Sequence, residues 1–247
     1  KDFLVDKPGM TTLAQLAEVR RVQRETGRIY SVFFSERFES RATERASKLV
    51  AEGAIGRVVQ TIGLGPHRAS LGQRPKWFFE RERYGGVLCD IASHQVDQFL
   101  HFTGAYDAEV VASTVANWAH PEHPGFEDFG ELHLRGKAAT GTVRVDWYTP
   151  DALPTWGDGR LFVLGTEGYL EVRKYCDLGG APGPDHLFLV ERGELRRFDC
   201  RHDALPFGPA FAADVRDRTE TAMTQSHCFR ACELVLQAQT GAVRLGH

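Results

Sequence analysis

The hydrophobic pattern of the sequence changes early in the chain, and this change limits the folds that the chain can adopt. Two apolar runs, residues 2–6 and 29–34, flank a segment, 13–26, in which apolar residues recur about every three positions. Thr12 and Gly27 stand where a helix of that length would begin and end. A buried strand, a helix and a second strand in succession predict one crossover unit of a parallel sheet.

The second part of the sequence has a different character. After a further predicted helix over residues 40–52, residues 57–197 are mainly strand-like runs separated by Gly and Pro turns. Predicted strands include residues 58–62, 109–112 and 142–147, and predicted helices cover residues 86–102 and 224–243. Runs of strands with few helices between them indicate a mostly antiparallel sheet. We therefore predict an α+β fold, in which a partial Rossmann-like α/β unit precedes a mostly antiparallel sheet with flanking helices.

The composition narrows the class of protein. The chain has 247 residues, 42% of them hydrophobic, which is enough for a well-buried core. With 33 acidic against 30 basic residues it presents no basic field for nucleic acid and no polybasic tract for a membrane. The five cysteines form no Cys-x-x-Cys pair, and Cys228 and Cys232 are expected to fill a helix core. A small-molecule partner and a cytoplasmic location are the resulting expectations.

Asp90, His94 and Asp97 fall on one side of the predicted helix over residues 86–102, while the apolar residues of that segment fall on the other side. An imidazole beside carboxylates on a rigid element suits proton transfer. The sequence therefore predicts a catalytic face. From the residues alone, a core histidine that is hydrogen-bonded to the backbone is the favoured interpretation of His94.

Several weak motifs occur in a specific order and together carry a resemblance. Lys7 stands just past the first predicted strand, where open parallel sheets bind their ligands. The turn Asp6-Lys7-Pro8, the step Glu52–Gly56 and the pair Gly85-Gly86 followed by Asp90 and His94 complete the set. In these features the chain resembles the Gfo/Idh/MocA family of nicotinamide-dependent oxidoreductases, with Asp6 where that family commonly has Glu.

The resemblance implies an enzyme that interconverts a secondary alcohol and a ketone on a sugar, cyclitol or related polyol with NAD or NADP. It implies that His94 is the general base or acid, that Asp90 orients it, and that Lys7 stabilises charge on the reacting oxygen. Lys7 and Pro8 would lie beside the cofactor. The same resemblance implies a homo-oligomer.

The resemblance also implies a division of the chain. Residues 1–38 would be the last part of a dinucleotide-binding domain, and residues 39–247 a domain for substrate binding and oligomerisation. No Gly-x-Gly-x-x-Gly follows a predicted strand, although the family begins with such a Gly-rich half. We therefore expect the 247 residues alone to be inactive.

Four residues are predicted substrate contacts: Arg68, Trp77, Tyr84 and Asp97. Sugars stack on aromatic rings and accept hydrogen bonds from arginine, whereas core or interface packing explains the run Trp77-Phe78-Phe79 equally well.

Two other functions stay open at this stage. One is a metal-dependent hydrolase that uses Asp90, His94 and Asp97 with His67 or His120, although no recognised zinc spacing is present and we predict no metal. The other is a lobe that binds a sugar or a protein without catalysis. The sequence does not indicate the substrate, the direction of the reaction or the choice between NAD and NADP.

Overall fold

A computed structural model describes residues 1–246. Its first part is the predicted crossover unit: strand β1 (Phe3–Asp6), helix α1 (Leu13–Thr26) and strand β2 (Tyr30–Phe33), with β1 and β2 parallel. Thr12 caps α1 by accepting a hydrogen bond from the amide of Gln15, and Gly27 ends it in the left-handed conformation. The sequence prediction of this unit is confirmed.

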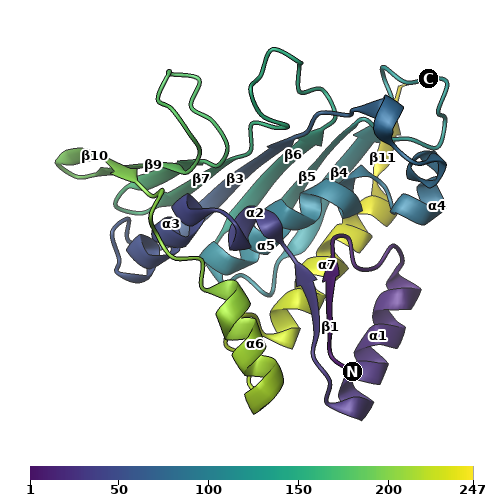
Figure 1. Ribbon diagram of the computed structural model, residues 1–247, viewed down its shortest axis with the longest axis horizontal. Coiled ribbons are helices and arrows are strands. Elements are labelled where there is room, and N and C mark those ends of the chain that lie inside the picture. The colour runs from purple at the N-terminus through teal and green to yellow at the C-terminus, as the bar shows by residue number, and fades with distance from the viewer. Residues whose placement is uncertain (247) are drawn as a thin grey trace.

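The expectation that the first strand is buried is wrong. Phe3 and Leu4 of β1 are 54% and 46% exposed, because β1 has a strand neighbour on one side only, β2, in the described chain. Helix α6 (Phe207–Asp217), which the sequence did not predict, lies beside this small sheet in the lower part of Figure 1. The rings of Phe207 and Phe33 lie 5.5 Å apart there.

The larger part is a nine-stranded sheet, mostly antiparallel as predicted. Its strands lie in the order β10-β9-β8-β7-β3-β6-β5-β4-β11, and the pairs β3–β6 and β4–β11 are parallel. The bounds are β3 (Val58–Pro66), β4 (Glu109–Ala116), β5 (Phe129–Arg135), β6 (Thr140–Asp146), β7 (Arg160–Gly165), β8 (Tyr169–Arg173), β9 (His186–Glu191), β10 (Glu194–Asp199) and β11 (Val243–Leu245).

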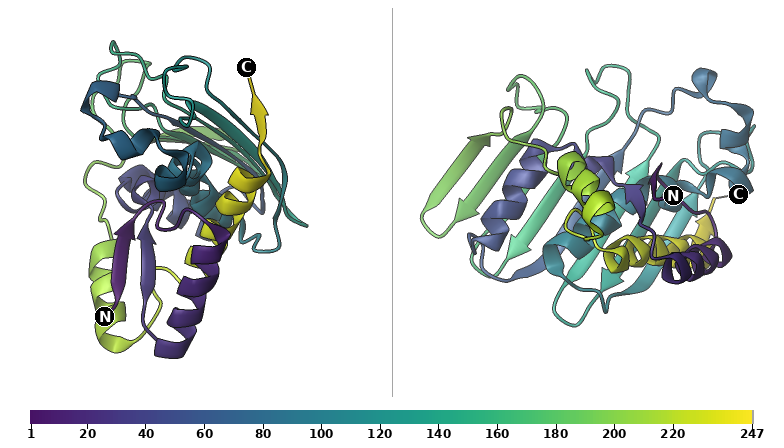
Figure 2. Two further views of the ribbon diagram at one scale, coloured as in Figure 1. Left: turned by 90° about the vertical axis from the view of Figure 1, so that its right-hand side faces the viewer. Right: turned by 60° about the horizontal axis from the view of Figure 1, so that its bottom comes forward.

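Three helices cover one face of this sheet, and the other face carries no described helix (Figure 2). They are α3 (Arg41–Ala51), α5 (Ser93–Thr103) and α7 (Gln225–Gly241). Short helical segments complete the fold: α2 (Ser35–Phe38), η1 (Leu71–Gln73), η2 (Lys76–Phe79), α4 (Arg81–Tyr84) and a π turn, η3 (Leu88–Ala92). No described helix is long and apolar enough to cross a membrane.

Helix α5 lies close to the sheet because glycines line its track. A Cβ atom on Gly63 or Gly65 of β3 would lie 2.6 or 2.7 Å from the side chain of Gln95, which is too close for contact. Gly141 of β6 accommodates Phe99 in the same way. These glycines let the start of α5, which carries His94, sink into the core. The predicted buried positions of Cys228 and Cys232 on α7 are also confirmed.

Candidate active site

Two charged residues far apart in the sequence meet where the small sheet joins the large part. Lys7 follows the last residue of β1, and its peptide bond to Pro8 is cis. Asp90 lies in the π turn before α5. The ammonium nitrogen of Lys7 lies 2.6 Å from Oδ1 of Asp90, and both side chains are mostly buried. The second carboxylate oxygen of Asp90 is buried and has no hydrogen-bond partner among residues 1–246.

His94 stands in the first turn of α5 and is 2% exposed. The edge of its ring meets Phe34, with ring centroids 6.4 Å apart. Its Nδ1 is buried without a hydrogen-bond partner in the described chain. Burial lowers the pKa of His94 to about 4, although the negative charge of Glu36 opposes this. The imidazole is therefore neutral at pH 7 and can accept a proton.

A buried ion pair that the sequence analysis missed lies close to His94. The ammonium of Lys174, which follows β8, lies 2.6 Å from Oε2 of Glu36 in α2, and the two side chains are 0% and 1% exposed. Burial raises the pKa of Glu36, but the charge and hydrogen bond of Lys174 together with the nearby His94 and His67 outweigh it, so the pKa falls to about 2. Lys174 follows β8 directly and Glu36 lies in α2 shortly after β2, but no local sequence pattern links the two positions.

Asp97 has other partners. Its side chain is fully buried, Arg37 donates two hydrogen bonds of 2.7 Å to its carboxylate, and His227 Nε2 lies 2.8 Å from it. Burial raises the pKa of Asp97, yet the charge and hydrogen bonds of Arg37 bring it well below its usual range. This pairing joins α5 to α2 and α7. Because the carboxylate of Asp97 is already bound by Arg37 and His227, we do not propose Asp97 as a substrate contact.

The other predicted substrate contacts differ in their surroundings. Tyr84 is 3% exposed and accepts a hydrogen bond from the amide of Glu127, so its hydroxyl faces the core. Trp77 is 42% exposed beside Phe78. Arg68 is partly exposed, and its guanidinium donates to the carbonyl oxygens of Pro150 and Leu153. Arg68 and Trp77 remain available to a ligand, whereas Tyr84 packs in the core.

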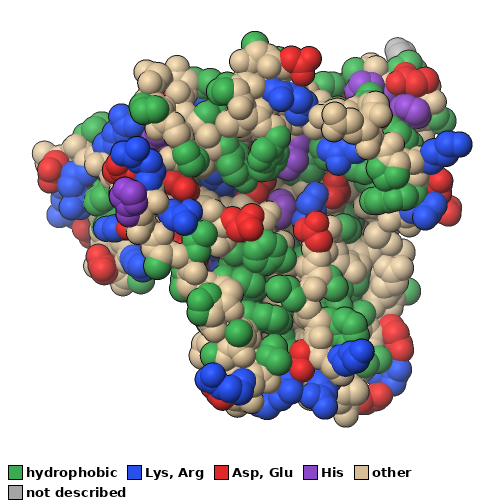
Figure 3. Space-filling view, in the orientation of Figure 1, with side chains coloured by type: hydrophobic (Ala, Val, Ile, Leu, Met, Phe, Trp, Pro, Cys, Tyr) green, Lys and Arg blue, Asp and Glu red, His purple; other side chains and the backbone are tan. Residues whose placement is uncertain are grey.

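A cavity of about 790 Å³ includes Arg68 in its lining, whereas Lys7, Asp90 and His94 are not among its lining residues. Arg68, Trp156 and Tyr175 belong to its lining, and the ring of Trp156 lies 4.5 Å from that of His67 and 4.4 Å from that of Tyr175. Tyr175 follows Lys174 directly, so the cavity wall connects with the buried ion pair. In the view of Figure 3, histidine, basic and acidic side chains gather at the middle of the molecule, above the junction with the small sheet.

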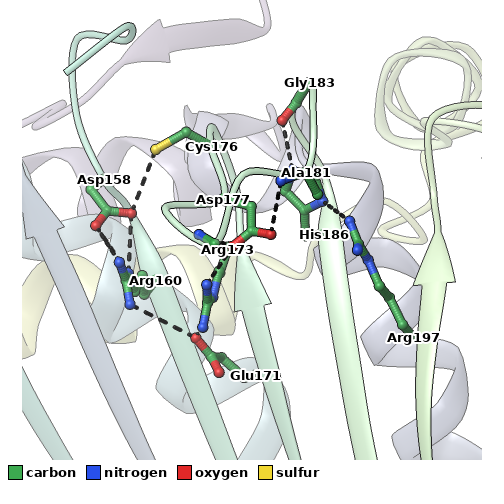
Figure 4. A network of polar contacts seen from close by, with 11 residues as sticks. Asp158, Arg160, Glu171, Arg173, Cys176, Asp177, Ala181, Gly183, His186 and Arg197 are labelled. Atoms are coloured by element: carbon green, nitrogen blue, oxygen red, sulfur yellow. Dashed lines mark hydrogen bonds and ion pairs between the residues drawn. The ribbon is translucent and has the colours of Figure 1, made fainter.

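A network of ion pairs holds the loop after β8 that forms one wall of the cavity (Figure 4). Arg160 pairs with Asp158, and Arg173 pairs with both Glu171 and Asp177. Asp177 in turn accepts hydrogen bonds from the amides of Gly179 and Ala181. These contacts attach the loop to the open face of the large sheet, which is the face that carries no described helix.

Metal coordination has no support in the described chain. Within residues 1–246, no group of three or more His, Cys, Asp or Glu side chains is arranged to hold a metal ion. His67 and His120, which the hydrolase hypothesis invoked, have other neighbours: His67 lies against Trp147 and Trp156, and His120 lies against Phe126.

Comparison with known proteins identifies relatives of this chain. Residues 43–171 match the model of the GFO/IDH/MocA C-terminal domain. An uncharacterised oxidoreductase of Escherichia coli K12, YdgJ, is 31% identical over 106 residues, which are 42% of this chain and only 30% of YdgJ.

Solved structures share the whole fold. A candidate oxidoreductase from Erwinia carotovora atroseptica is 50% identical, with a TM-score of 0.96 over all of this chain and 74% of that protein. KijD10, a 3-ketoreductase from Actinomadura kijaniata that was solved with NADP and TDP-benzene, is 18% identical, with a TM-score of 0.73 over 99% of this chain and 72% of that protein. At this low identity the second likeness concerns the fold alone.

Proposed function

The chain belongs to the Gfo/Idh/MocA family, and we propose that it forms the substrate-binding part of an NAD(P)-dependent oxidoreductase. The reaction is the interconversion of a secondary alcohol and a ketone on a sugar, cyclitol or related polyol. One observation carries this proposal: the 2.6 Å contact between Lys7 and Asp90, beside the buried imidazole of His94.

His94 is the proposed base. Oxidation of an alcohol requires a group that removes the hydroxyl proton, and a neutral imidazole with a pKa of about 4 is in the accepting form at pH 7. The ammonium of Lys7 would stabilise the negative charge that develops on the alcohol oxygen. Asp90 holds that ammonium through Oδ1, and its unpartnered Oδ2 can accept a hydrogen bond from a neighbouring hydroxyl.

The cofactor is NAD or NADP, whose nicotinamide ring accepts or donates the hydride. Lys7 and Pro8 are the residues of this chain that we assign to it, because they stand at the carboxyl end of a parallel strand. They fit only the reactive end of a dinucleotide, since no Gly-x-Gly-x-x-Gly follows a strand in the sequence. We therefore propose that residues 1–38 complete a dinucleotide-binding domain and that residues 39–247 form the substrate and oligomerisation domain.

The rest of the substrate would occupy the cavity of about 790 Å³. Trp156 is 45% exposed at its edge and offers a flat face for the apolar side of a sugar ring. The Arg68 guanidinium, already fixed by carbonyl oxygens, offers donors to hydroxyl groups. Trp77, which is 42% exposed, is a further proposed contact.

A dehydrogenase screen tests the proposal. The full-length protein would be assayed against a panel of sugars and cyclitols with NAD and with NADP. His94→Ala should lower kcat by roughly 100-fold or more while KM changes little, because the base acts in the reaction step. We expect the 247-residue chain alone to give no turnover. Equal rates for the parent and the His94→Ala variant would exclude the assignment of the base.

A further inference from the structure

The pair formed by Glu36 and Lys174 has no role in the mechanism above, although it is among the most deeply buried charged groups of the described chain. Taking two charges out of water is unfavourable, and a buried pair is seldom worth more to stability than apolar residues of the same size. Both residues also lie outside the segment 43–171 that matches the family domain. Their burial therefore calls for an explanation other than stability.

The pair is linked to His94 on two sides. The side-chain amide of Gln95, the next residue in α5, donates a hydrogen bond of 2.9 Å to the same oxygen of Glu36 that Lys174 contacts. Phe34, two residues before Glu36, meets the edge of the His94 ring. The short helix α2 thus contacts the first turn of α5 through both a polar and an apolar contact.

The polar atoms of this group are incompletely paired. Oε1 of Glu36, Nδ1 of His94 and Oε1 of Gln95 are all buried and have no hydrogen-bond partner among the described residues. Buried polar atoms without partners are rare in folded proteins, and each requires an explanation such as a catalytic role or a bound water or ion. These atoms belong to α2 and to the first turn of α5, which the hydrogen bond from Gln95 to Glu36 joins.

We propose that Glu36 and Lys174 are positioning residues for His94, which hold its helix turn in place and set the proton affinity of the imidazole by two opposed charges. The inference rests on the proposed function of His94. The anion of Glu36 favours the protonated imidazole and the cation of Lys174 disfavours it. Lys7 after β1 and His67 after β3 also act on the pKa of His94, and both lower it. Asp90 lies one turn before His94 on the same helical segment.

Histidine NMR titration of the 247-residue chain tests this proposal without any cofactor. The signal of His94 is identified by its loss in His94→Gln. Glu36→Gln should move its titration midpoint to lower pH and Lys174→Met should move it to higher pH, each by about one pH unit. The double variant should return the midpoint close to that of the parent. The surface pair Arg45 and Asp203 supplies the control, Arg45→Met with Asp203→Asn, which should leave the midpoint unchanged.

A single substitution leaves one buried charge and can unfold the chain, so the double variant is also assayed in the full-length enzyme. We expect kcat to fall roughly 10- to 100-fold with a smaller change in KM, as for residues that support a functional group. Parental kcat and an unchanged pH profile in the double variant would overturn the proposal, as would single variants that shift the midpoint in the same direction. If His94→Ala keeps full activity, the proposed base is wrong, whereas the titration still reports on the pair.

Discussion

The ammonium nitrogen of Lys7 lies 2.6 Å from a carboxylate oxygen of Asp90, although the two residues are 83 positions apart in the sequence. The contact joins the end of the small parallel sheet to the π turn that leads into α5. It therefore brings one residue from each part of the chain to the proposed reacting oxygen.

Replacement of Lys7 tests this relationship. Lys7→Met keeps the length of the side chain and removes its charge, so we expect kcat/KM of the full-length enzyme to fall by roughly 100- to 1,000-fold, the usual effect of losing one stabilising donor. Steady-state kinetics measure the change. Lys137→Met, at an exposed position, is the matched control and should retain parental rates. A Lys7→Met variant as active as this control would remove Lys7 from the reaction.

Much of the fold could be predicted because local signals coincide with the tertiary structure. The cap at Thr12, the apolar spacing of α1 and the left-handed Gly27 agree, so that helix was predicted within its observed bounds. The strand-rich region gave the mostly antiparallel sheet for the same reason. Strand β11 and the parallel pairing of β3 with β6 were missed, because pairing partners are distant in sequence and leave no local pattern.

The candidate site was predictable only in part. Asp90 and His94 share a helix face, and helical spacing is visible in a sequence. The same spacing included Asp97, but Arg37 and His227 approach it from α2 and α7, which no spacing reveals. The contact of Glu36 with Lys174 spans 138 positions and was likewise invisible.

Asp97 provides a prediction for stability. Asp97→Ala would leave the buried guanidinium of Arg37 without its carboxylate, so we expect the free energy of unfolding to fall by about 3–5 kcal/mol. Urea denaturation of the 247-residue chain measures it. Asp199→Ala removes an exposed carboxylate that pairs with Arg201, and it should have little effect. Similar losses in the two variants would contradict the structural role of Asp97.

The glycines of β3 provide a second prediction for stability. A Cβ atom at Gly63 would lie 2.6 Å from Cγ of Gln95, so Gly63→Ala must push α5 away from the sheet and should cost about 1–3 kcal/mol. Gly241→Ala at the end of α7 is the control, because a Cβ atom there meets no atom within 4 Å other than its chain neighbours and alanine favours a helix. Thermal unfolding of both variants should give shifts of opposite sign. A neutral Gly63→Ala would mean that α5 does not approach β3 this closely.

The open face of the large sheet is the surface on which we predict a homo-oligomer. Ile62, Phe162 and Leu164 lie on outward positions of β3 and β7, beside Tyr169 of β8. An apolar group of this kind on a sheet is typical of a subunit interface. Leu164→Glu should convert the oligomer to a monomer in light scattering after size-exclusion chromatography, while Leu13→Glu on α1, which lies outside this sheet, should not. A monomeric parent protein would exclude the prediction.

The buried histidines predict a dependence of stability on pH. Burial lowers the pKa of both His67 and His94 to about 4, whereas an unfolded histidine titrates near 6.5. Between these values the unfolded chain binds protons that the folded chain does not, so their contribution is complete above about pH 6.5 and is lost as the pH falls toward 4. Each histidine should change the free energy of unfolding by up to about 1.4 kcal/mol per pH unit in this window.

Urea midpoints measured from pH 7.5 to 4.5 should fall less steeply in His94→Gln than in the parent, and the exposed variant His202→Gln should match the parent. A slope that is the same in all three proteins would mean that folding does not lower the pKa of His94.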